Sequence, residues 1–379
     1  MEIEARKKDH IRISLEKDVS YRKTTWLEWV ELPHKAAPEI DPEDITMDTT
    51  FLGRRFTHPL IIESMTGGTL EAEKINRNLA EAASIFGVPM GVGSQRAGVV
   101  KPETAYTFRV ARETGPDVFL IGNIGGSQLV EHGLEIAVKA VEMIDADALA
   151  IHLNPLQEIV QPDGRPRFRG LLTTLRKLRR ELQIPIILKE IGAGISREVA
   201  GAAEDLYDAV DVAGSGGTNW TLIEMLRAGE VEHRDKVALA ETFLEWGIPT
   251  AAAIMESRVV TRKYLVGSGG LRTGLDVARA LALGANMAGM AHPFLEPATK
   301  SVDDVLEKLR RISEELRAAM FLTGSRTLED LKRSPVVVRG PLLEWAVQRC
   351  PKHPKLYSWQ KMKSKESTLS RRQKPKRSN

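Results

Sequence analysis

The sequence predicts an α/β fold: a closed (β/α)₈ barrel with an N-terminal extension and a basic C-terminal tail. Short apolar segments recur along the chain, and most are followed by Gly, Ser or Asn and then by a helical pattern. Apolar strands that alternate with amphipathic helices are typical of a parallel sheet covered by helices. Eight such units over about 240 residues fit a closed barrel, whereas the alternative, a doubly wound sheet, usually has about five or six strands.

The eight strands are predicted at residues 60–64, 88–93, 118–122, 148–154, 185–190, 209–214, 263–267 and 286–291. The first helix shows the amphipathic pattern well. Within residues 71–86, Ile75, Leu79 and Phe86 fall on one stripe, while Lys74 and Arg77 face away from it. A helix is likewise expected at 275–283, before the last strand.

Three parts are expected along the chain. Residues 1–59 form an extension that covers the barrel mouth, 60–350 form the catalytic barrel with one or two terminal helices over 301–350, and 351–379 form the tail. The connection over residues 218–262 exceeds a usual crossover and holds Trp220 and a helix-like stretch at 238–246. Such an insertion at the active-site face is a candidate lid or assembly element.

Composition narrows the class of protein. The chain is 42% hydrophobic and 28% charged, as expected for a globular protein with a full core. A single cysteine, Cys350, excludes an intrachain disulfide and favours a reducing, cytoplasmic location. The N-terminus lacks the apolar core of a signal peptide, and no apolar run reaches the ~18 residues of a membrane span.

The tail concentrates positive charge. Residues 352–379 hold ten Lys or Arg and one acid, Glu366, and so carry +9; because the whole chain carries +3, the rest is acidic at −6. From about Lys361 the tail is expected to be disordered. It is either a solvated terminus or a segment that binds nucleic acid or anionic lipid.

A glycine-rich stretch late in the chain predicts a phosphate site. Residues 267–274 read Gly-Ser-Gly-Gly-Leu-Arg-Thr-Gly and precede a helix, whose opening N–H groups attract an anion. Barrels often bind phosphate with the loops after strands seven and eight, and small residues also occur at 289–292. The alternative is that Gly269 and Gly270 only form a tight turn.

Polar and small residues end the first three strands. Ser64-Met-Thr-Gly-Gly would let a flat ring lie against the backbone, and Ser94, Arg96 and Asn123 add donors and a cation. Any one of these three strand ends could be polar only because it caps a turn. Three successive strand ends with such residues are hard to explain by turn chemistry alone.

Strand four carries a polar face. Alternation puts His152 and Asn154 on the same face, where buried polar groups need partners, although a satisfied core histidine is the alternative. The following Gln157 and Glu158 favour a ligand site. Glu158 is a candidate Mg²⁺ ligand, because one carboxylate plus substrate phosphates commonly holds that ion.

Three further features have two interpretations each. Lys189 ends an apolar strand, where its charge is costly unless it meets an anion or an electron-rich ring. Thr218 could cap a helix or donate to a phosphate. Arg6 and Lys7 precede the barrel, and are either functional or part of a solvated charged terminus.

Taken together, the motifs resemble the type 2 isopentenyl-diphosphate isomerases, from their archaeal branch, over about residues 5–345. The motifs are Arg-Lys-x-Asp-His at 6–10, Ser-Met-Thr-Gly-Gly at 64–68, Gly-Ser-Gln-Arg at 93–96, Gly-Asn at 122–123, His-Leu-Asn-x-x-Gln-Glu at 152–158, Lys-Glu at 189–190, Gly-Gly-Thr at 216–218 and Gly-Gly-Leu-Arg-Thr-Gly at 269–274. The set in this order is specific, whereas each motif alone is weak. The resemblance does not extend to the tail after about Pro351 and implies nothing about it.

The resemblance implies a TIM barrel that interconverts isopentenyl and dimethylallyl diphosphate with reduced FMN, Mg²⁺ and NADPH as the reductant. It also implies a homo-oligomer, a tetramer or an octamer, and no membrane contact. The flavin contacts that it implies are Ser64, Met65, Thr66, Ser94, Asn123, Lys189, Thr218, Gly269, Gly270, Leu271, Ala291 and His292. His292 departs from the family, in which a small or variable residue is expected.

The substrate contacts that the resemblance implies are Arg6, Lys7, Ser94, Gln95, Arg96, His152, Asn154 and Gln157. Gln157 and Glu158, with the reduced flavin, are the implied catalytic groups, and Glu158 is the implied metal ligand. Two other functions stay open. One is another FMN-dependent barrel oxidoreductase, such as a 2-hydroxy-acid oxidase or an enzyme like inosine-monophosphate dehydrogenase, which would need a nucleophilic cysteine in a barrel loop, whereas Cys350 lies beyond the barrel. The other is a non-enzymatic scaffold whose tail binds nucleic acid.

Overall fold

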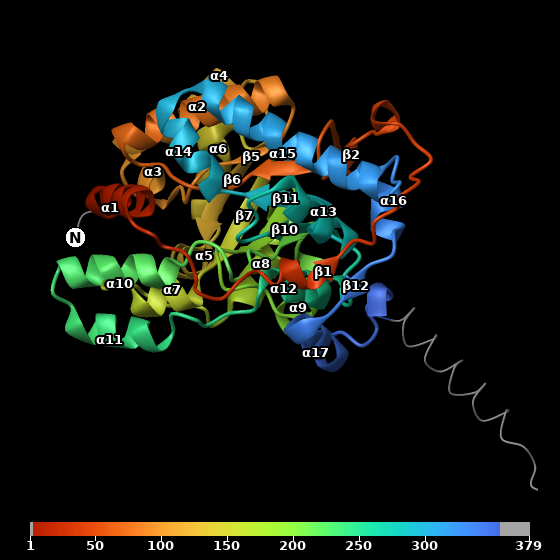
Figure 1. Cartoon of the computed structure of the whole chain (residues 1–379). Helices are drawn as coiled ribbons and strands as arrows, with labels where there is room; N and C mark the ends of the chain where they lie inside the picture. Colours follow the sequence, from red (N-terminus) through yellow and green to blue (C-terminus); the bar gives the residue numbers. More distant parts are fainter. Residues whose placement is uncertain (1–2, 357–379) are drawn as a thin grey trace, which may run out of the picture.

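The computed structural model describes residues 3–356, and its centre is a closed barrel of eight parallel strands (Figure 1). The strands follow one another around the ring in chain order, and β11 closes the ring by pairing with β4. The strands are β4 (Leu60–Ile62), β5 (Met90–Gly91), β6 (Leu120–Gly125), β7 (Ala148–Leu153), β8 (Ile186–Glu190), β9 (Ala209–Asp211), β10 (Tyr264–Ser268) and β11 (Met287–Met290). The predicted (β/α)₈ barrel and its eight strand positions are therefore confirmed.

Helices surround the barrel and bury their apolar faces against it. They are α2 (Leu70–Phe86), α3 (Arg96–Val100), α4 (Tyr106–Thr114), α5 (Gly126–His132), α6 (Glu135–Ile144), α7 (Pro155–Val160), α8 (Leu171–Glu181), α9 (Arg197–Ala202), α13 (Gly274–Ala282) and α14 (His292–Lys300). In α2 the Thr69 side chain caps the first turn by accepting from the Ala72 amide, and Gly87 ends the helix at a φ of 75°. The predicted helices at 71–86 and 275–283 correspond to α2 and α13.

The interior of the barrel is filled with side chains at its amino-terminal end. Along β7, Ala148 and Ala150 point into the barrel, whereas Leu149 and Ile151 pack outward against the helices. A hairpin of β2 (Thr49–Phe51) and β3 (Arg54–Phe56) adds two phenylalanines to this interior cluster. The hairpin therefore plugs one end of the barrel, and a cavity remains at the carboxyl ends of the strands.

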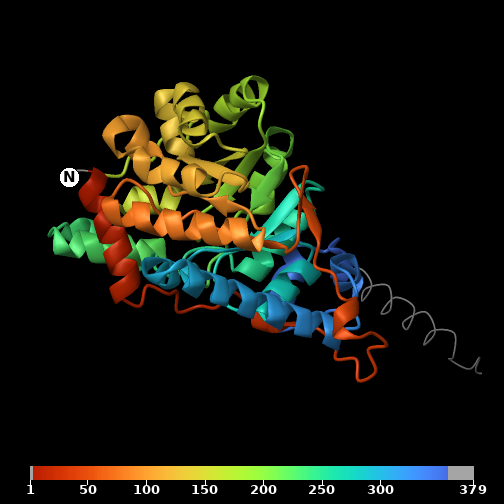
Figure 2. The same cartoon turned by 90° about the horizontal axis from the view of Figure 1, so that it is seen from above.

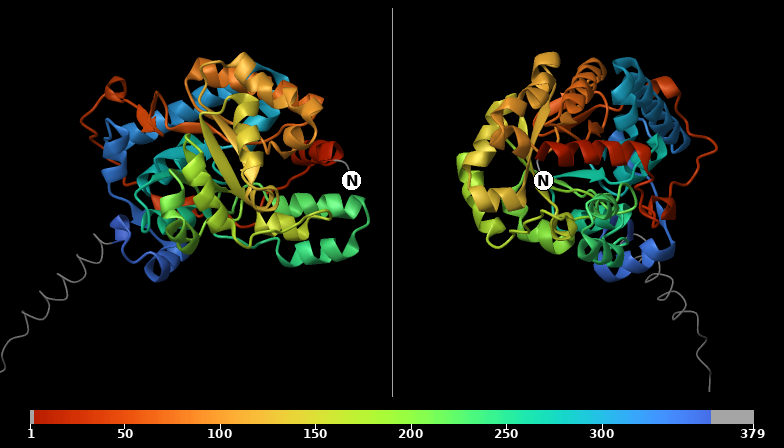
Figure 3. Two further views of the ribbon diagram at one scale, coloured as in Figure 1. Left: turned by 180° about the vertical axis from the view of Figure 1, so that it is seen from behind. Right: turned by 90° about the vertical axis from the view of Figure 1, so that its left-hand side faces the viewer.

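The N-terminal extension begins with α1 (Ile3–Glu16), which lies in front of the barrel in the right-hand view of Figure 3. Its remainder crosses the molecule to β1 (Val30–Glu31), which pairs with β12 (Val337–Val338) near the other end of the chain. Short 3₁₀ turns occur at Leu27–Trp29, Pro42–Asp44, Pro102–Thr104 and Glu204–Leu206.

The long connection after β9 contains three helices: α10 (Trp220–Glu230), α11 (Arg234–Thr242) and α12 (Thr250–Arg258). The sequence predicts a helix over 238–246, which is wrong at both ends, because α11 begins at Arg234 and ends at Thr242. The Phe243 amide bonds back to Ala240, so the helix ends in a tight turn before Gly247. Helices α10 and α11 form a hairpin beside α7 (Figure 1).

The C-terminal region contains three helices rather than the one or two that the sequence predicts. They are α15 (Val302–Leu322), α16 (Leu328–Arg333) and α17 (Gly340–Arg349), and α15 packs along α2 (Figure 2). The predicted tail starts at residue 351, but His353 and Leu356 are buried, and His353 Nε2 lies 3.0 Å from the Leu283 carbonyl oxygen. The first six residues of the tail thus belong to the packed body, and the disorder expected from about Lys361 lies outside the described residues.

Within residues 3–356, none of the helices combines the length and the apolar character that crossing a membrane requires.

Candidate active site

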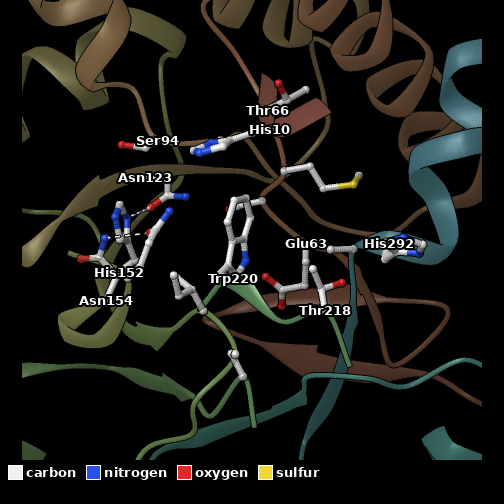
Figure 4. Close-up of a pocket in the computed structure, with 18 of the residues that line it drawn as sticks. His10, Glu63, Thr66, Ser94, Asn123, His152, Asn154, Thr218, Trp220 and His292 are labelled. Atoms are coloured by element: carbon white, nitrogen blue, oxygen red, sulfur yellow. Dashed lines mark hydrogen bonds between the residues drawn. The ribbon is translucent and has the colours of Figure 1, made fainter. Parts of the chain in front are cut away.

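One large pocket is lined by residues at the carboxyl ends of the barrel strands and by residues of α1. Figure 4 shows some of the side chains that line it. The flavin contacts that the sequence suggested all line it: Ser64, Met65, Thr66, Ser94, Asn123, Lys189, Thr218, Gly269, Gly270, Leu271, Ala291 and His292. The suggested substrate and metal residues line it too, with one exception: Arg6, Lys7, Ser94, Arg96, His152, Asn154, Gln157 and Glu158. These residues come from all eight strand ends and from α1, so the fold brings together positions that are far apart in the chain.

Gln95 is the exception, since it is fully buried and does not line the pocket. Its Nε2 donates to the Ala140 carbonyl oxygen at 2.7 Å, and its Oε1 accepts from the Asn123 amide at 2.8 Å. The amide group therefore ties β6 to α6. The structure gives Gln95 a role in holding Asn123 in place rather than a substrate contact.

Three cations gather at the pocket mouth: Arg6 and Lys7 from α1, and Arg96 at the start of α3. Burial, together with the nearby Arg6 and Arg96, lowers the pKa of Lys7 to about 7. Burial and Arg6 also lower the pKa of Arg96, whose buried Nε has no hydrogen-bond partner within residues 3–356. Three cations that repel one another, one of them with an unsatisfied buried N–H, indicate a site that binds an anion of high charge.

The inward face of β7 is polar, as the alternation of its residues predicts. His152 Nδ1 lies 2.7 Å from Asn123 Oδ1, and because that oxygen can only accept, Nδ1 carries the proton (Figure 4). Burial, aided by Lys7 and Lys189, lowers the pKa of His152 to about 3. The imidazole is therefore neutral and presents Nε2 as an acceptor.

Glu158 is a buried carboxylate on the first turn of α7. Its Oε1 accepts from Gln128 Nε2 at 3.2 Å and from Asn154 Nδ2 at 3.3 Å, and its Oε2 accepts from the Arg165 amide at 2.9 Å. Within the described part of the chain, no cluster of three or more His, Cys, Asp or Glu side chains is arranged to hold a metal. A metal ion at Glu158 would therefore need most of its ligands from water and from a bound anion.

A second network joins α1 to α10, and the sequence analysis did not identify its acidic members. Glu224 Oε1 lies 2.9 Å from His10 Nε2 and accepts from Gln157 Nε2 at 2.9 Å. Burial alone would raise the pKa of Glu224, but His10 and Arg227 stabilise the negative charge of its carboxylate and lower the pKa to about 2. The motif at 6–10 contains His10, but Glu224 lies in the long insertion, where no sequence pattern marks it.

Asp163 extends this network to the cations at the mouth. It lies 2.8 Å from Arg6 Nη1 and 3.0 Å from Arg227 Nη2, and Arg227 Nε donates to Glu224 at 2.8 Å. The His10 ring also contacts Trp220 edge-on, with 5.2 Å between ring centroids. The insertion thus holds α1 in place over the pocket.

Lys189 lies at the base of the pocket between two acids. Its Nζ is 2.5 Å from Asp211 Oδ2 and 3.0 Å from Glu63 Oε2. Burial alone would lower the pKa of Lys189, but Asp211 and Glu63 outweigh it and raise the pKa above its ordinary value. The lysine is therefore charged, as its place at a strand end suggested, and Glu63 is a second residue that the sequence analysis missed.

The glycine-rich loops form a cradle of bare backbone. A Cβ on Gly217 would lie 2.4 Å from Gly270, and a Cβ on Gly269 would lie 2.2 Å from the Gly214 carbonyl oxygen. Gly269 and Gly270 have φ values of 97° and 77°, which disfavour other residues. The buried Thr66 Oγ1 and Asn154 Oδ1 have no hydrogen-bond partner within residues 3–356. Backbone amides, a cation and free polar groups around a wide pocket fit the phosphate and the ring of FMN.

The sequence model of the FMN-dependent dehydrogenase family matches residues 154–338. The chain is 47% identical to an isopentenyl-diphosphate delta-isomerase of Thermococcus kodakarensis, over 91% of this chain and 94% of that protein. It is 45% identical to the isopentenyl-diphosphate delta-isomerase of Methanothermobacter thermautotrophicus, over 92% of this chain and 97% of that protein.

Solved structures of low sequence identity share the fold. A putative lactate oxidase of Pediococcus acidilactici aligns with a TM-score of 0.63 at 16% identity, over 90% of this chain and 96% of that one. A mandelate oxidase aligns with a TM-score of 0.56 at 19% identity, over 89% of this chain and 93% of that one. These likenesses support the barrel fold alone.

Proposed function

The chain belongs to the isopentenyl-diphosphate delta-isomerase family, and we propose that it interconverts isopentenyl and dimethylallyl diphosphate by using reduced FMN and Mg²⁺. The observation that carries this proposal is the arrangement of the pocket. Three mutually repelling cations lie at its mouth, and a glycine cradle with polar strand ends lies below them.

Arg6, Lys7 and Arg96 would bind the diphosphate. A substrate with several negative charges relieves the repulsion among these cations and restores the positive charge of Lys7, whose pKa is lowered to about 7 without it. Because Arg6 and Lys7 belong to α1, binding of the diphosphate also holds that helix over the reacting end of the substrate and excludes water.

Glu158 would hold the Mg²⁺ ion, with diphosphate oxygens and water as the other ligands. The donors Gln128, Asn154 and the Arg165 amide fix the orientation of its carboxylate. His152 Nε2, on a ring that is held neutral, and the free Asn154 Oδ1 would offer acceptors beside this ion, for example to its water ligands.

The flavin would lie across the strand ends, with its phosphate on the Gly269–Gly270 cradle and near Ala291 and His292. In its reduced form, bound FMN would supply an acid–base group and an electron-rich face next to the alkene. Ser64, Met65, Thr66, Asn123, Lys189 and Thr218 would orient the ring, and the free Thr66 Oγ1 is available for a contact with it.

The reaction moves a double bond, so one carbon gains a proton and another loses one. Gln157 would hold the reacting end, since its Nε2 is fixed by Glu224 and its Oε1 by Asn154 Nδ2 at 3.0 Å. The Glu224 carboxylate lies behind Gln157 within one hydrogen bond, and the same carboxylate oxygen pairs with His10.

The alternative, an FMN-dependent oxidoreductase, would consume an oxidant in every turnover, whereas the isomerase consumes none. A variant of that chemistry that needs a nucleophilic cysteine is disfavoured, because burial raises the pKa of the Cys350 thiol to about 12 and the residue follows α17, outside the barrel. The oligomeric state is a separate proposal: light scattering on the purified protein should give the mass of a tetramer or an octamer. The tail is proposed not to take part in catalysis, so removal of residues 357–379 should leave isomerisation intact.

An anaerobic assay tests the proposed reaction. The protein is reduced once with dithionite and mixed with isopentenyl diphosphate and Mg²⁺, and dimethylallyl diphosphate is then measured. We expect product far beyond the amount of flavin, since no electrons are consumed. Product limited to one equivalent per flavin, or activity that needs a continuous electron acceptor, would contradict the isomerase; NADPH in place of dithionite tests the proposed reductant.

A further inference from the structure

Three charged side chains meet inside the barrel at the base of the pocket, and we call them the Glu63–Lys189–Asp211 cluster. Lys189 on β8 and Asp211 on β9 are register partners on neighbouring strands. Glu63 follows β4, which lies on the opposite side of the ring from β8. Lys189 thus bridges the barrel, and all three side chains are buried.

The two carboxylates are not equivalent partners of Lys189. Asp211 also accepts from the Ser268 hydroxyl and from the Ala213 amide, so further donors stabilise its charge. Glu63 shares Lys189 with Asp211 and packs against Gly289, where a Cβ would lie 2.1 Å from its Oε1. Burial, and then the charge of Asp211, raise the pKa of Glu63 to about 7. Glu63 is therefore the member of the cluster that gains or loses a proton near neutral pH.

Resting on the FMN site proposed above, we propose that Glu63 is a positioning residue that competes with the flavin ring for the charge of Lys189. Because of this competition, the Glu63 carboxylate takes up a second proton when the flavin is reduced. Glu63, Lys189 and the strand ends assigned to the ring line the same pocket, and Glu63 directly precedes Ser64, Met65 and Thr66.

The charge balance gives the reason. With both carboxylates ionised, the cluster carries one net negative charge in a poorly solvated place. Two-electron reduction by an external reductant adds one proton to flavin N5 and leaves one negative charge on the ring, which repels that cluster. A second proton, taken from water by the Glu63 carboxylate, neutralises the cluster and leaves Lys189 free to face the ring. Two electrons and two protons are then taken up together.

The other ionisable groups near Lys189 do not explain the uptake of a second proton equally well. His152 stays neutral, since its pKa lies at about 3. Glu190 is the serious competitor, because burial raises its pKa to about 7 as well. However, its Oε2 accepts from the amides of Ile191, Gly192 and Ala193, and no ion pair joins it to Lys189 among the described contacts. Glu190→Gln is therefore a matched control for Glu63→Gln.

The test is the midpoint potential of the flavin in the holoprotein, measured anaerobically with redox dyes over a range of pH on both sides of 7. Each proton taken up with two electrons lowers the potential by about 30 mV for a tenfold fall in proton concentration. The wild-type protein should change from about 30 to about 60 mV per pH unit as the pH rises past about 7. Glu63→Gln should stay near about 30 mV per pH unit and be easier to reduce at high pH.

Glu190→Gln should retain the wild-type slope. The proposal is overturned if Glu63→Gln keeps the steeper slope, or if Glu190→Gln alone loses it. Should Glu63→Gln fail to retain FMN, the wild-type profile still decides, because a constant slope of about 30 mV per pH unit leaves no second proton to assign. Failure of the proposed function would look different: the wild-type protein would then hold no flavin, or would not isomerise the substrate.

Discussion

Replacing Lys7 by methionine removes one cation from the pocket mouth while keeping a side chain of similar length. In the substrate-free protein, burial and the neighbouring Arg6 and Arg96 hold the pKa of Lys7 at about 7 rather than 10.5. At about 1.4 kcal/mol per pKa unit, this difference corresponds to at most about 5 kcal/mol that a bound anion could recover. Because Lys7 is only half-buried, solvent screens part of this interaction with the anion, and we expect Lys7→Met to weaken substrate binding by about 2–3 kcal/mol.

The loss should appear as an increase in KM of about 30- to 150-fold at neutral pH, with the flavin still bound. The pH dependence has a definite sign. Free Lys7 loses its proton as the pH rises through about 7, whereas bound diphosphate raises the pKa of the ammonium. Substrate affinity of the wild-type protein should therefore fall above about pH 7, by up to about tenfold per pH unit, and Lys7→Met should lack this component.

The assay is steady-state isomerisation by pre-reduced holoprotein across pH, with FMN content measured in parallel. Lys8→Met is the matched control, since Lys8 is exposed and lies 3.1 Å from Glu4 on the same helix. It should leave KM within about twofold of the wild-type value. If Lys7→Met also changes KM by less than about twofold, then α1 does not bind the diphosphate and the reasoning is wrong.

Three further predictions concern the metal and the flavin. Glu158→Gln should shift the Mg²⁺ titration of activity to higher concentration while FMN stays bound, because an amide lacks the charge of a carboxylate; an unchanged titration curve would exclude Glu158 as the ligand. Lys189→Ala should make the flavin harder to reduce by about 20–45 mV, equivalent to about 1–2 kcal/mol for two electrons, and a spectroelectrochemical titration that finds no decrease would contradict it. Gly217→Ala should weaken FMN binding, because its Cβ would lie 2.4 Å from Gly270, whereas Gly229→Ala, with open space around it, should not; equal FMN affinity of the two variants would contradict the cradle.

Much of the fold was predictable because of how parallel strands are buried. Strands that are covered on both faces consist of short apolar runs, such as residues 148–151, and helices with one apolar stripe separate them. The carboxyl ends of such strands meet at one end of a barrel, so polar residues such as Asn123 and Lys189 could be assigned to one pocket before any coordinates were known. Gln95 was wrongly assigned, because its position next to Arg96 does not reveal that its side chain points at Ala140.

The tertiary structure alone decided which charges meet. The sequence by itself determined the barrel, the family motifs and the place of the pocket, since these depend on local periodicity and on short runs of neighbouring residues. Glu63 pairs with Lys189 across the ring, and Glu224 in the insertion pairs with His10 near the N-terminus. Neither pair lies in a local pattern, because such contacts arise only when the barrel closes and α1 folds back over its mouth.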